Sequence, residues 1–232
     1  MKKIRAAFHP RERAVNDKMK TEYLGHSAFL IKCEDFSVCF DPHKDIGYDL
    51  KPVTCDYCVC SHGHFDHAAY SLVEYKTLIS EKNNETAGVC GEKFRRVQIF
   101  HDDKSGALRG KNYAAIFCAD GLTVCHLGDA GEKYTDEIAE KLGKIDVLFI
   151  PVGGRYTIDA FEAKRYVCGI NPKIVVPMHY KTQKSVLDIS GKGEFLKLFD
   201  KESVKNVTSP FEINAKTLPE KLTVLNIDDR AF

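Results

Sequence analysis

The 232-residue sequence predicts an α/β fold in which two mixed β-sheets pack face to face with helices outside. Two observations support this fold class. Short apolar or alternating segments come first, joined by hairpin turns, and later segments of this kind alternate with helical patterns. Histidines and aspartates directly follow several of these segments, which is typical of functional side chains at the end of a sheet.

The first third of the chain is predicted to form four strands and a helix. Alternating apolar residues predict three strands, at 21–24, 28–31 and 36–40. A fourth apolar segment, 57–60, predicts a buried strand. We expect the segment 68–79 to form a helix.

The remaining two thirds are predicted to mix strands with helices. Strands are expected at 87–90, 96–100, 113–118, 122–127, 146–150, 173–176 and 222–227. Helices are expected at 133–142, 158–168 and 194–199. Asp120 and Gly121 form a typical hairpin turn. The continuous apolar character of 146–150 indicates a strand buried on both faces.

The composition is that of an ordinary globular protein. Hydrophobic residues make up 44% of the chain, charged residues 29%, and the formal net charge is +1. No apolar run approaches the length of a membrane span, and no apolar stretch follows the basic N-terminus, so we expect neither a membrane anchor nor a secretory signal. The length fits one domain over 1–232, with the polar segment 1–18 interpreted as an N-terminal arm.

Nine cysteines, an odd number, are spread through the apolar segments, as at Cys39 and Cys125. Buried reduced thiols have this distribution, so we expect a cytoplasmic protein. Cys55 and Cys58 have the spacing of a metal or redox motif, but no second pair matches it and the segment enters a strand. We therefore interpret them as structural thiols.

The segment 61–67 holds four donors, the residues His62, His64, Asp66 and His67. Neutral imidazole and carboxylate are good ligands for zinc and other first-row divalent metals. Asp66 could instead cap a following helix, but capping needs one residue and not four. Four donors exceed what one tetrahedral ion needs, so the segment predicts a site for two ions.

Three further donors follow other predicted strands, namely His101, Asp129 and His179. Strand ends on one edge of a domain lie close together, so these residues can converge on 61–67. Singly, Asp129 could be a helix cap and His179 a surface residue. Together the seven residues supply five histidines and two aspartates, near the number that two ions need with positions left for water.

This order of donors resembles the metallo-β-lactamase-fold superfamily of metal-dependent hydrolases. Finer motifs, at 23–31, 126–129, 150–154 and 177–180, are similar to a bacterial branch related to ascorbate-6-phosphate lactonase and N-acyl-phosphatidylethanolamine phospholipase D. The resemblance spans residues 23–182. It implies a four-layer αββα sandwich of two mixed β-sheets flanked by helices.

The resemblance also implies a role for each donor. Each ion would have three ligands of its own, His62, His64 and His101 for one, and Asp66, His67 and His179 for the other. Asp129 would bridge the ions, and Asp41 would orient a ligand from behind. We expect two zinc ions, with manganese or iron as alternatives that suit the same donors.

The implied activity is hydrolysis of a small molecule. A hydroxide that bridges the ions would attack a carbonyl carbon or a phosphorus, with Asp66 orienting it and receiving its proton. His26 and three basic residues near the donors, Arg109, Arg155 and Lys181, are expected to bind the substrate. Because two divalent ions leave the site positively charged, we expect an anionic ester, lactone or phosphodiester.

Three alternatives to this function remain. One is a non-catalytic metal-binding protein. A second is a nucleic-acid phosphodiesterase of the same fold, which the near-zero net charge disfavours. The third is an iron-dependent oxidoreductase, but flavodiiron proteins place a glutamate where this chain has His64 and carry a flavin domain. A homo-oligomer is compatible with the sequence.

Other residues near the donors have structural interpretations. His126 lies in an apolar strand and is predicted to be a core histidine, whereas His43 is predicted to face solvent. Gly153 and Gly154 are expected to let the backbone pass close to the metal site, with a plain tight turn as the alternative.

Overall fold

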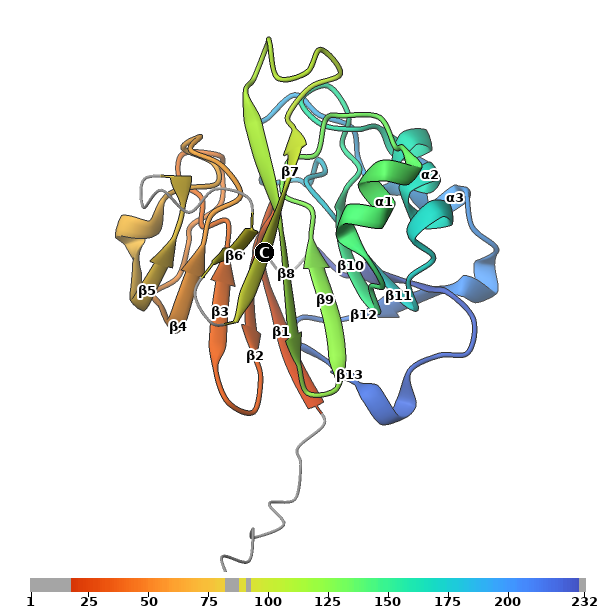
Figure 1. The fold of residues 1–232 in the computed structure, drawn as a ribbon, viewed down its shortest axis with the longest axis horizontal. Helices are drawn as coiled ribbons and strands as arrows, with labels where there is room; N and C mark the ends of the chain where they lie inside the picture. Colours follow the sequence, from red (N-terminus) through yellow and green to blue (C-terminus); the bar gives the residue numbers. More distant parts are fainter. Residues whose placement is uncertain (1–17, 82–87, 91–92, 230–232) are drawn as a thin grey trace, which may run out of the picture.

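The computed structural model describes residues 18–81, 88–90 and 93–229, whose strands form two sheets (Figure 1). The first sheet has the strand order β13-β1-β2-β3-β4-β5, and the second has the order β12-β14-β11-β10-β9-β8-β7-β6. Both sheets mix parallel and antiparallel pairs. Residues 1–17 of the expected N-terminal arm lie outside the described residues.

The first sheet combines an N-terminal meander with one strand from the C-terminal part of the chain. Its strands are β1 (Lys18–Gly25), β2 (Ala28–Lys32), β3 (Ser37–Phe40), β4 (Val53–Val59), β5 (Val73–Ile79) and β13 (Phe211–Asn214). Strands β1 to β3 are antiparallel, as the short turns between them require, and β3 to β5 are parallel. The late strand β13 pairs antiparallel with β1, so a strand from the end of the chain covers this edge.

The second sheet is antiparallel at one end and parallel at the other. Its strands are β6 (Gly88–Cys90), β7 (Phe94–Phe100), β8 (Lys111–Ala119), β9 (Leu122–His126), β10 (Val147–Pro151), β11 (Ile174–Met178), β12 (Val204–Val207) and β14 (Thr223–Ile227). Every residue of β10 and β11 is buried, as the continuous apolar segment 146–150 predicted for β10.

Three α-helices lie beside the second sheet (Figure 1), namely α1 (Asp136–Leu142), α2 (Ala160–Ile170) and α3 (Gly193–Lys197). Thr135 caps α1 and Asp159 caps α2 by accepting a backbone N–H of the first turn. The architecture is the predicted sandwich of two mixed sheets with helices. No helix in the described part of the chain combines the length and the apolar character that crossing a membrane requires.

The predicted helix at 68–79 is wrong. Tyr70–Leu72 form a single 3-10 turn, and Val73–Ile79 form the edge strand β5. Strand β5 pairs in parallel with β4 along its length, and its valine, tyrosine, threonine and isoleucine favour extended backbone. Pairing with β4 therefore outweighs the helical pattern. Strands β12 and β13 were also not predicted, because their apolar patterns are short.

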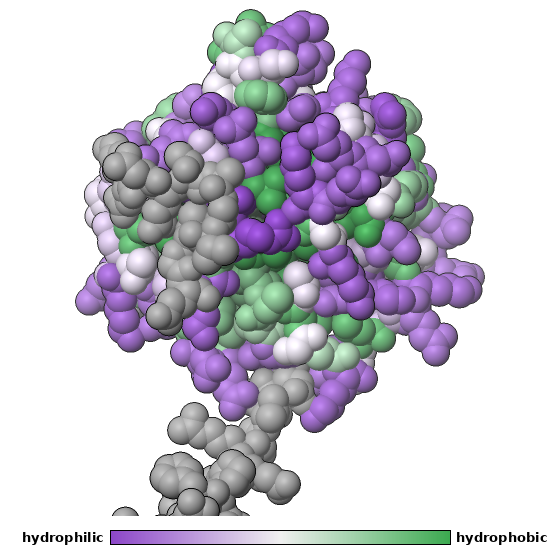
Figure 2. Space-filling view, in the orientation of Figure 1, coloured by the Kyte–Doolittle hydropathy of each residue, from purple (hydrophilic) through white to green (hydrophobic). Residues whose placement is uncertain are grey.

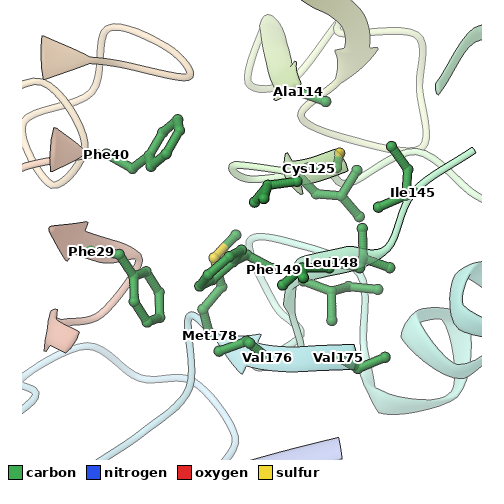
Figure 3. Close-up of a cluster of buried hydrophobic side chains, with 14 of the residues drawn as sticks. Phe29, Phe40, Ala114, Cys125, Ile145, Leu148, Phe149, Val175, Val176 and Met178 are labelled. Atoms are coloured by element: carbon green, nitrogen blue, oxygen red, sulfur yellow. The ribbon is translucent and has the colours of Figure 1, made fainter. Parts of the chain in front are cut away.

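The core between the sheets sets their relative position. In Figure 3 the rings of Phe29 and Phe40, from the first sheet, point toward Phe149 and Met178 of the second. The ring centroids of Phe29 and Phe149 are 4.7 Å apart, and all four side chains are buried. This packing brings the ends of β4, β7, β9 and β11 to one edge of the sandwich.

Candidate metal centre

The predicted donors occupy the loops that follow four strands. The loop after β4 carries His62, His64, Asp66 and His67, while β7, β9 and β11 are followed by His101, Asp129 and His179. Because both sheets contribute strand ends to one edge, these seven side chains converge from distant parts of the sequence.

The donor atoms form three overlapping groups, and within each group they lie within 4.8 Å of one another. The groups are His62, His64 and His101; His26, Asp66, His67 and His179; and His62, His67 and Asp129. The first group equals the set expected for one ion. The second equals the set expected for the other ion, with His26 added.

Asp129 stands between the first two groups. Its Oδ2 lies 3.1 Å from Nε2 of His67, 3.1 Å from Nε2 of His179 and 3.4 Å from Nε2 of His101. Burial alone would raise the pKa of Asp129, but the neighbouring His179 and His67 hold it well below its ordinary value. The lowered pKa favours the ionised carboxylate, which lies beside donors of both of these groups.

These spacings fit donors that share an ion. Two donors on one tetrahedral ion, each at about 2.1 Å, lie about 3.4 Å apart. The distances around Asp129 are close to this value, and Nε2 of His62 lies 3.0 Å from Nδ1 of His64.

Unpaired buried atoms at the same place support this fit. Those without a hydrogen-bond partner in the described part of the chain include Nε2 of His67, Oδ1 of Asp129 and both ring nitrogens of His26. Each such atom costs about 1–3 kcal/mol. A divalent ion would satisfy several of them together, so the donor set fits metal ions.

His26 belongs to the donors by position, although the sequence predicted a substrate-binding role. It is fully buried, its ring centroid is 4.1 Å from that of His179, and its Nε2 is 3.7 Å from Oδ2 of Asp66. Burial, together with the nearby His179, lowers the pKa of His26 to about 3. A neutral imidazole offers a lone pair, so His26 is a candidate fourth ligand of the second group.

Asp41 supports the donors from behind, in the position expected for it. The buried carboxylate accepts hydrogen bonds from His67 Nδ1 (2.9 Å), Ser61 N (2.7 Å) and Ser61 Oγ (2.7 Å). Because His67 donates through Nδ1, its Nε2 is directed at the site. Ser61 Oγ also lies 3.0 Å from Nδ1 of His62 and can accept its proton. The sequence predicted no role for Ser61, whose only signal is its place before His62.

We expect Asp41→Ala to lower metal affinity by about 10–100-fold, because His67 loses the partner that sets its tautomer. Titration against a chromophoric chelator measures this affinity. Asp56→Ala is a matched control, since Asp56 also accepts from the N and Oγ of one serine, Ser37, but lies away from the donors. Equal affinities in the two variants would contradict the role of Asp41.

Asn112 positions the backbone of Asp129, which the sequence did not predict. Its Oδ1 accepts the Asp129 N–H (2.8 Å), and its Nδ2 donates to the carbonyl of Leu127 (2.8 Å). Gly128, between Leu127 and Asp129, has φ +56°, and a Cβ there would lie 2.3 Å from Asn112 Oδ1. Its only signal in the sequence is a polar residue directly before the apolar segment 113–118, and the structure shows that it is fully buried.

Gly153 lets two backbone segments meet, as expected. A Cβ at Gly153 would lie 2.1 Å from the carbonyl oxygen of His179, so only glycine fits here. Gly154 has φ +62°, and its nearest neighbour would be the Cβ of Asp159 at an ordinary 3.5 Å. Gly153 is therefore required where its backbone passes close to that of His179, and Gly154 provides the positive φ of a turn.

Two other histidines in the described part of the chain are His43 and His126, and the prediction holds for only one of them. His9, predicted to be a surface residue, lies outside the described residues. His126 is a satisfied core residue, as predicted, because its Nε2 donates to Ser27 O (2.9 Å) and its Nδ1 accepts from Gly128 N (3.2 Å). The prediction that His43 faces solvent is wrong. His43 is fully buried, and its Nε2 lies 3.0 Å from the carbonyl of Leu24.

A cavity of about 600 Å³ opens over the donors. It is lined by Gly63, His64, Phe65, Asp66, His101, Arg109, Asp129, Tyr156 and Leu187. Of the three basic residues expected to bind substrate, only Arg109 lines this cavity. Arg155 pairs with Asp188 and lines an adjoining cavity, and Lys181 Nζ donates to the carbonyl of Leu187 (2.6 Å).

Comparisons with known proteins agree with this geometry. Residues 20–179 match a family model described as the β-lactamase superfamily domain. A protein of Carboxydothermus hydrogenoformans, named a UPF0173 metal-dependent hydrolase, is 28% identical over 193 residues, covering 71% of this chain and 85% of that protein. A UPF0173 protein of Pyrococcus abyssi is 30% identical over 187 residues, covering 71% of this chain and 84% of that protein.

A solved structure extends the similarity to three dimensions. It is a crystal structure of a protein from Thermotoga maritima whose title places it in the metallo-β-lactamase superfamily. The two chains are 34% identical with a TM-score of 0.72, over 90% of this chain and 98% of that one. With the family model matching most of the sequence, the chain belongs to the β-lactamase superfamily domain family.

Proposed function

We propose that this chain is a metal-dependent hydrolase that uses two divalent ions to cleave a small anionic ester, lactone or phosphodiester. The observation that carries the proposal is the position of Asp129, whose Oδ2 lies within 3.4 Å of donors from both groups. The names of the relatives, which include several metal-dependent hydrolases, support the reaction class.

Each ion would be held by one group of donors, His62, His64 and His101 for the first, and Asp66, His67 and His179 for the second, with Asp129 bridging. Zinc suits this set of nitrogen and oxygen donors, and manganese or iron are alternatives. When bound, such ions polarise the oxygen of the scissile bond and lower the pKa of a coordinated water.

Asp66 and Arg109 would act directly on the reactants. Burial would raise the pKa of Asp66, but the adjacent His67 and His26 hold it below its ordinary value. The ionised carboxylate lines the cavity, where it can orient the attacking water and accept its proton. Arg109 lines the same cavity and can pair with the anionic group of the substrate.

The thiols support the expected location of the protein. The cysteines whose side chains the structure describes, including Cys55 and Cys58, are free. Both of these lie buried in a small apolar cluster on the first sheet, which supports their interpretation as structural thiols. We propose on this basis that the protein acts in the reducing cytoplasm.

Metal removal tests the proposed function. Protein purified without chelator should contain two ions per chain by elemental analysis. It should hydrolyse at least one member of a panel of lactones, bis(p-nitrophenyl) phosphate and p-nitrophenyl esters. Chelation should abolish turnover, and zinc or manganese should restore it. A chain that binds two ions but hydrolyses nothing would be a non-catalytic metal-binding protein, and full turnover without metal would refute the proposal.

A further inference from the structure

One large exposed apolar side chain, that of Phe65, lines the metal cavity, and three others belong to the segments around it. Five such residues are exposed in the described part of the chain, namely Phe65, Leu72, Leu108, Phe161 and Val186. Phe65 lines the cavity, and Leu108 and Val186 each precede a lining residue, Arg109 and Leu187. Phe161 lines the adjoining cavity of about 470 Å³, which shares Arg109 and Tyr156 with the first. Leu72 is the one residue of these five that neither lines a cavity nor precedes a lining residue.

Phe65 is a large apolar residue that stays half-exposed beside the donors. It lies between the donors His64 and Asp66 on the loop after β4, and it is 51% exposed. Tyr156 and Leu187 reach the same cavity from loops distant in sequence. Burial of exposed apolar surface is favourable, so an apolar group bound here would remove water from all three side chains.

Arg109 adds a positive charge to the lining of the same cavity. In the described part of the chain no carboxylate lies within ion-pair distance of it, and its guanidinium lies 5.5 Å from the centre of the Tyr156 ring. Its loop is held in place because Asp102 accepts the backbone N–H groups of Lys104, Gly106, Leu108 and Arg109 at 2.7–2.9 Å. Arg109 is therefore presented on an ordered loop with its charge available.

The loop between β7 and β8 carries an apolar and a basic side chain next to one another. It projects at the top of Figure 1, and in Figure 2 hydrophobic and hydrophilic residues lie side by side at this place. Leu108 and Arg109 are consecutive in it, the first exposed and the second lining the cavity. The loop thus carries an exposed apolar side chain next in sequence to the cation that lines the cavity.

We propose that the substrate is amphiphilic, with an apolar alkyl, acyl or aryl group packed on Phe65, Tyr156 and Leu187 and an anionic group paired with Arg109. This deepens the proposed function and rests on it. A volume of about 600 Å³ suits a small molecule with a short chain or a ring. The three apolar residues are then specificity determinants for the group next to the scissile bond.

Binding of n-alkylphosphonates tests the proposal without relying on turnover. Calorimetric titration of zinc-loaded protein with the methyl to hexyl members should give an affinity that rises about two- to fourfold per added CH2, the range for partial to full burial of a methylene. Phe65→Ala and Leu187→Ala should each flatten this dependence. Arg109→Met should weaken all members by a similar factor and leave the slope unchanged.

Leu72→Ala is the matched control, since Leu72 is 50% exposed and lies outside both cavities. It should leave the dependence on chain length intact. Metal content is measured in every variant, because Phe65 lies between two donors and its substitution could change metal binding. Leu187 is not next to a donor in the sequence, so Leu187→Ala reports on the apolar contact alone. An affinity independent of chain length in the unaltered protein, or an unchanged slope in both apolar variants, would overturn the inference. Metal-dependent hydrolysis in the panel above would still stand in that case.

Discussion

Asp129→Ala is expected to lower turnover by about a thousandfold or more and to reduce the bound metal below two ions per chain. The carboxylate lies 3.1 Å from donors on His67 and His179 and 3.4 Å from the donor on His101, so its loss removes the ligand that would bridge the two ions of the proposed site. The loop itself should stay in place, because Asn112 holds the backbone N–H of residue 129 and not its side chain.

Elemental analysis, turnover and circular dichroism on the same preparation separate these effects. Asp129→Asn is the matched variant, because it keeps the shape of the side chain and removes its charge. A similar loss in both variants would assign the effect to the carboxylate charge. Two bound ions with unimpaired turnover in Asp129→Ala would contradict the bridging role.

Gly153→Ala is expected to lower the free energy of unfolding by about 1–3 kcal/mol and to weaken metal binding. The added Cβ would lie 2.1 Å from the carbonyl oxygen of His179, a backbone atom that cannot move without moving the donor. Because His179 belongs to the second donor group, the displacement should be felt at that ion first.

Urea unfolding gives the stability, and zinc titration gives the affinity. Gly193→Ala is the control, since a Cβ there meets nothing within 4 Å and the residue begins α3. That substitution should be neutral or should stabilise the protein by about 0.4–1 kcal/mol, because alanine restricts the unfolded chain. Unchanged stability and metal affinity in Gly153→Ala would show that the two backbone segments can separate without cost.

Local patterns predicted most elements of the fold. The continuous apolar segment 146–150 predicted a strand buried on both faces, and β10 is such a strand. The segment 68–79 shows where local patterns fail. Its apolar spacing is compatible with a helix, and pairing with the free edge of β4 makes it a strand. Partner strands come from distant sequence, so β13 beside β1 could not be predicted from its four residues either.

The sequence by itself determined the chemistry of the site. Histidine and aspartate at the ends of apolar segments predicted a metal centre, because few other side chains bind first-row metals and strand ends meet at one edge. The structure brings His62, His101 and His179 together from three separate loops. These identities and their order needed no knowledge of packing.

Only the tertiary structure decided where the remaining side chains point. His26 lies among the donors, Arg155 pairs with Asp188, and Lys181 is held by the carbonyl of Leu187. Arg155 and Lys181 stand in loops next to predicted donors, and that proximity in sequence was the reason to expect them in the substrate pocket. His26 was expected there because it lies in the motif at 23–31. The direction of a loop side chain depends on partners that are distant in sequence, and the packing of the two sheets supplies those partners.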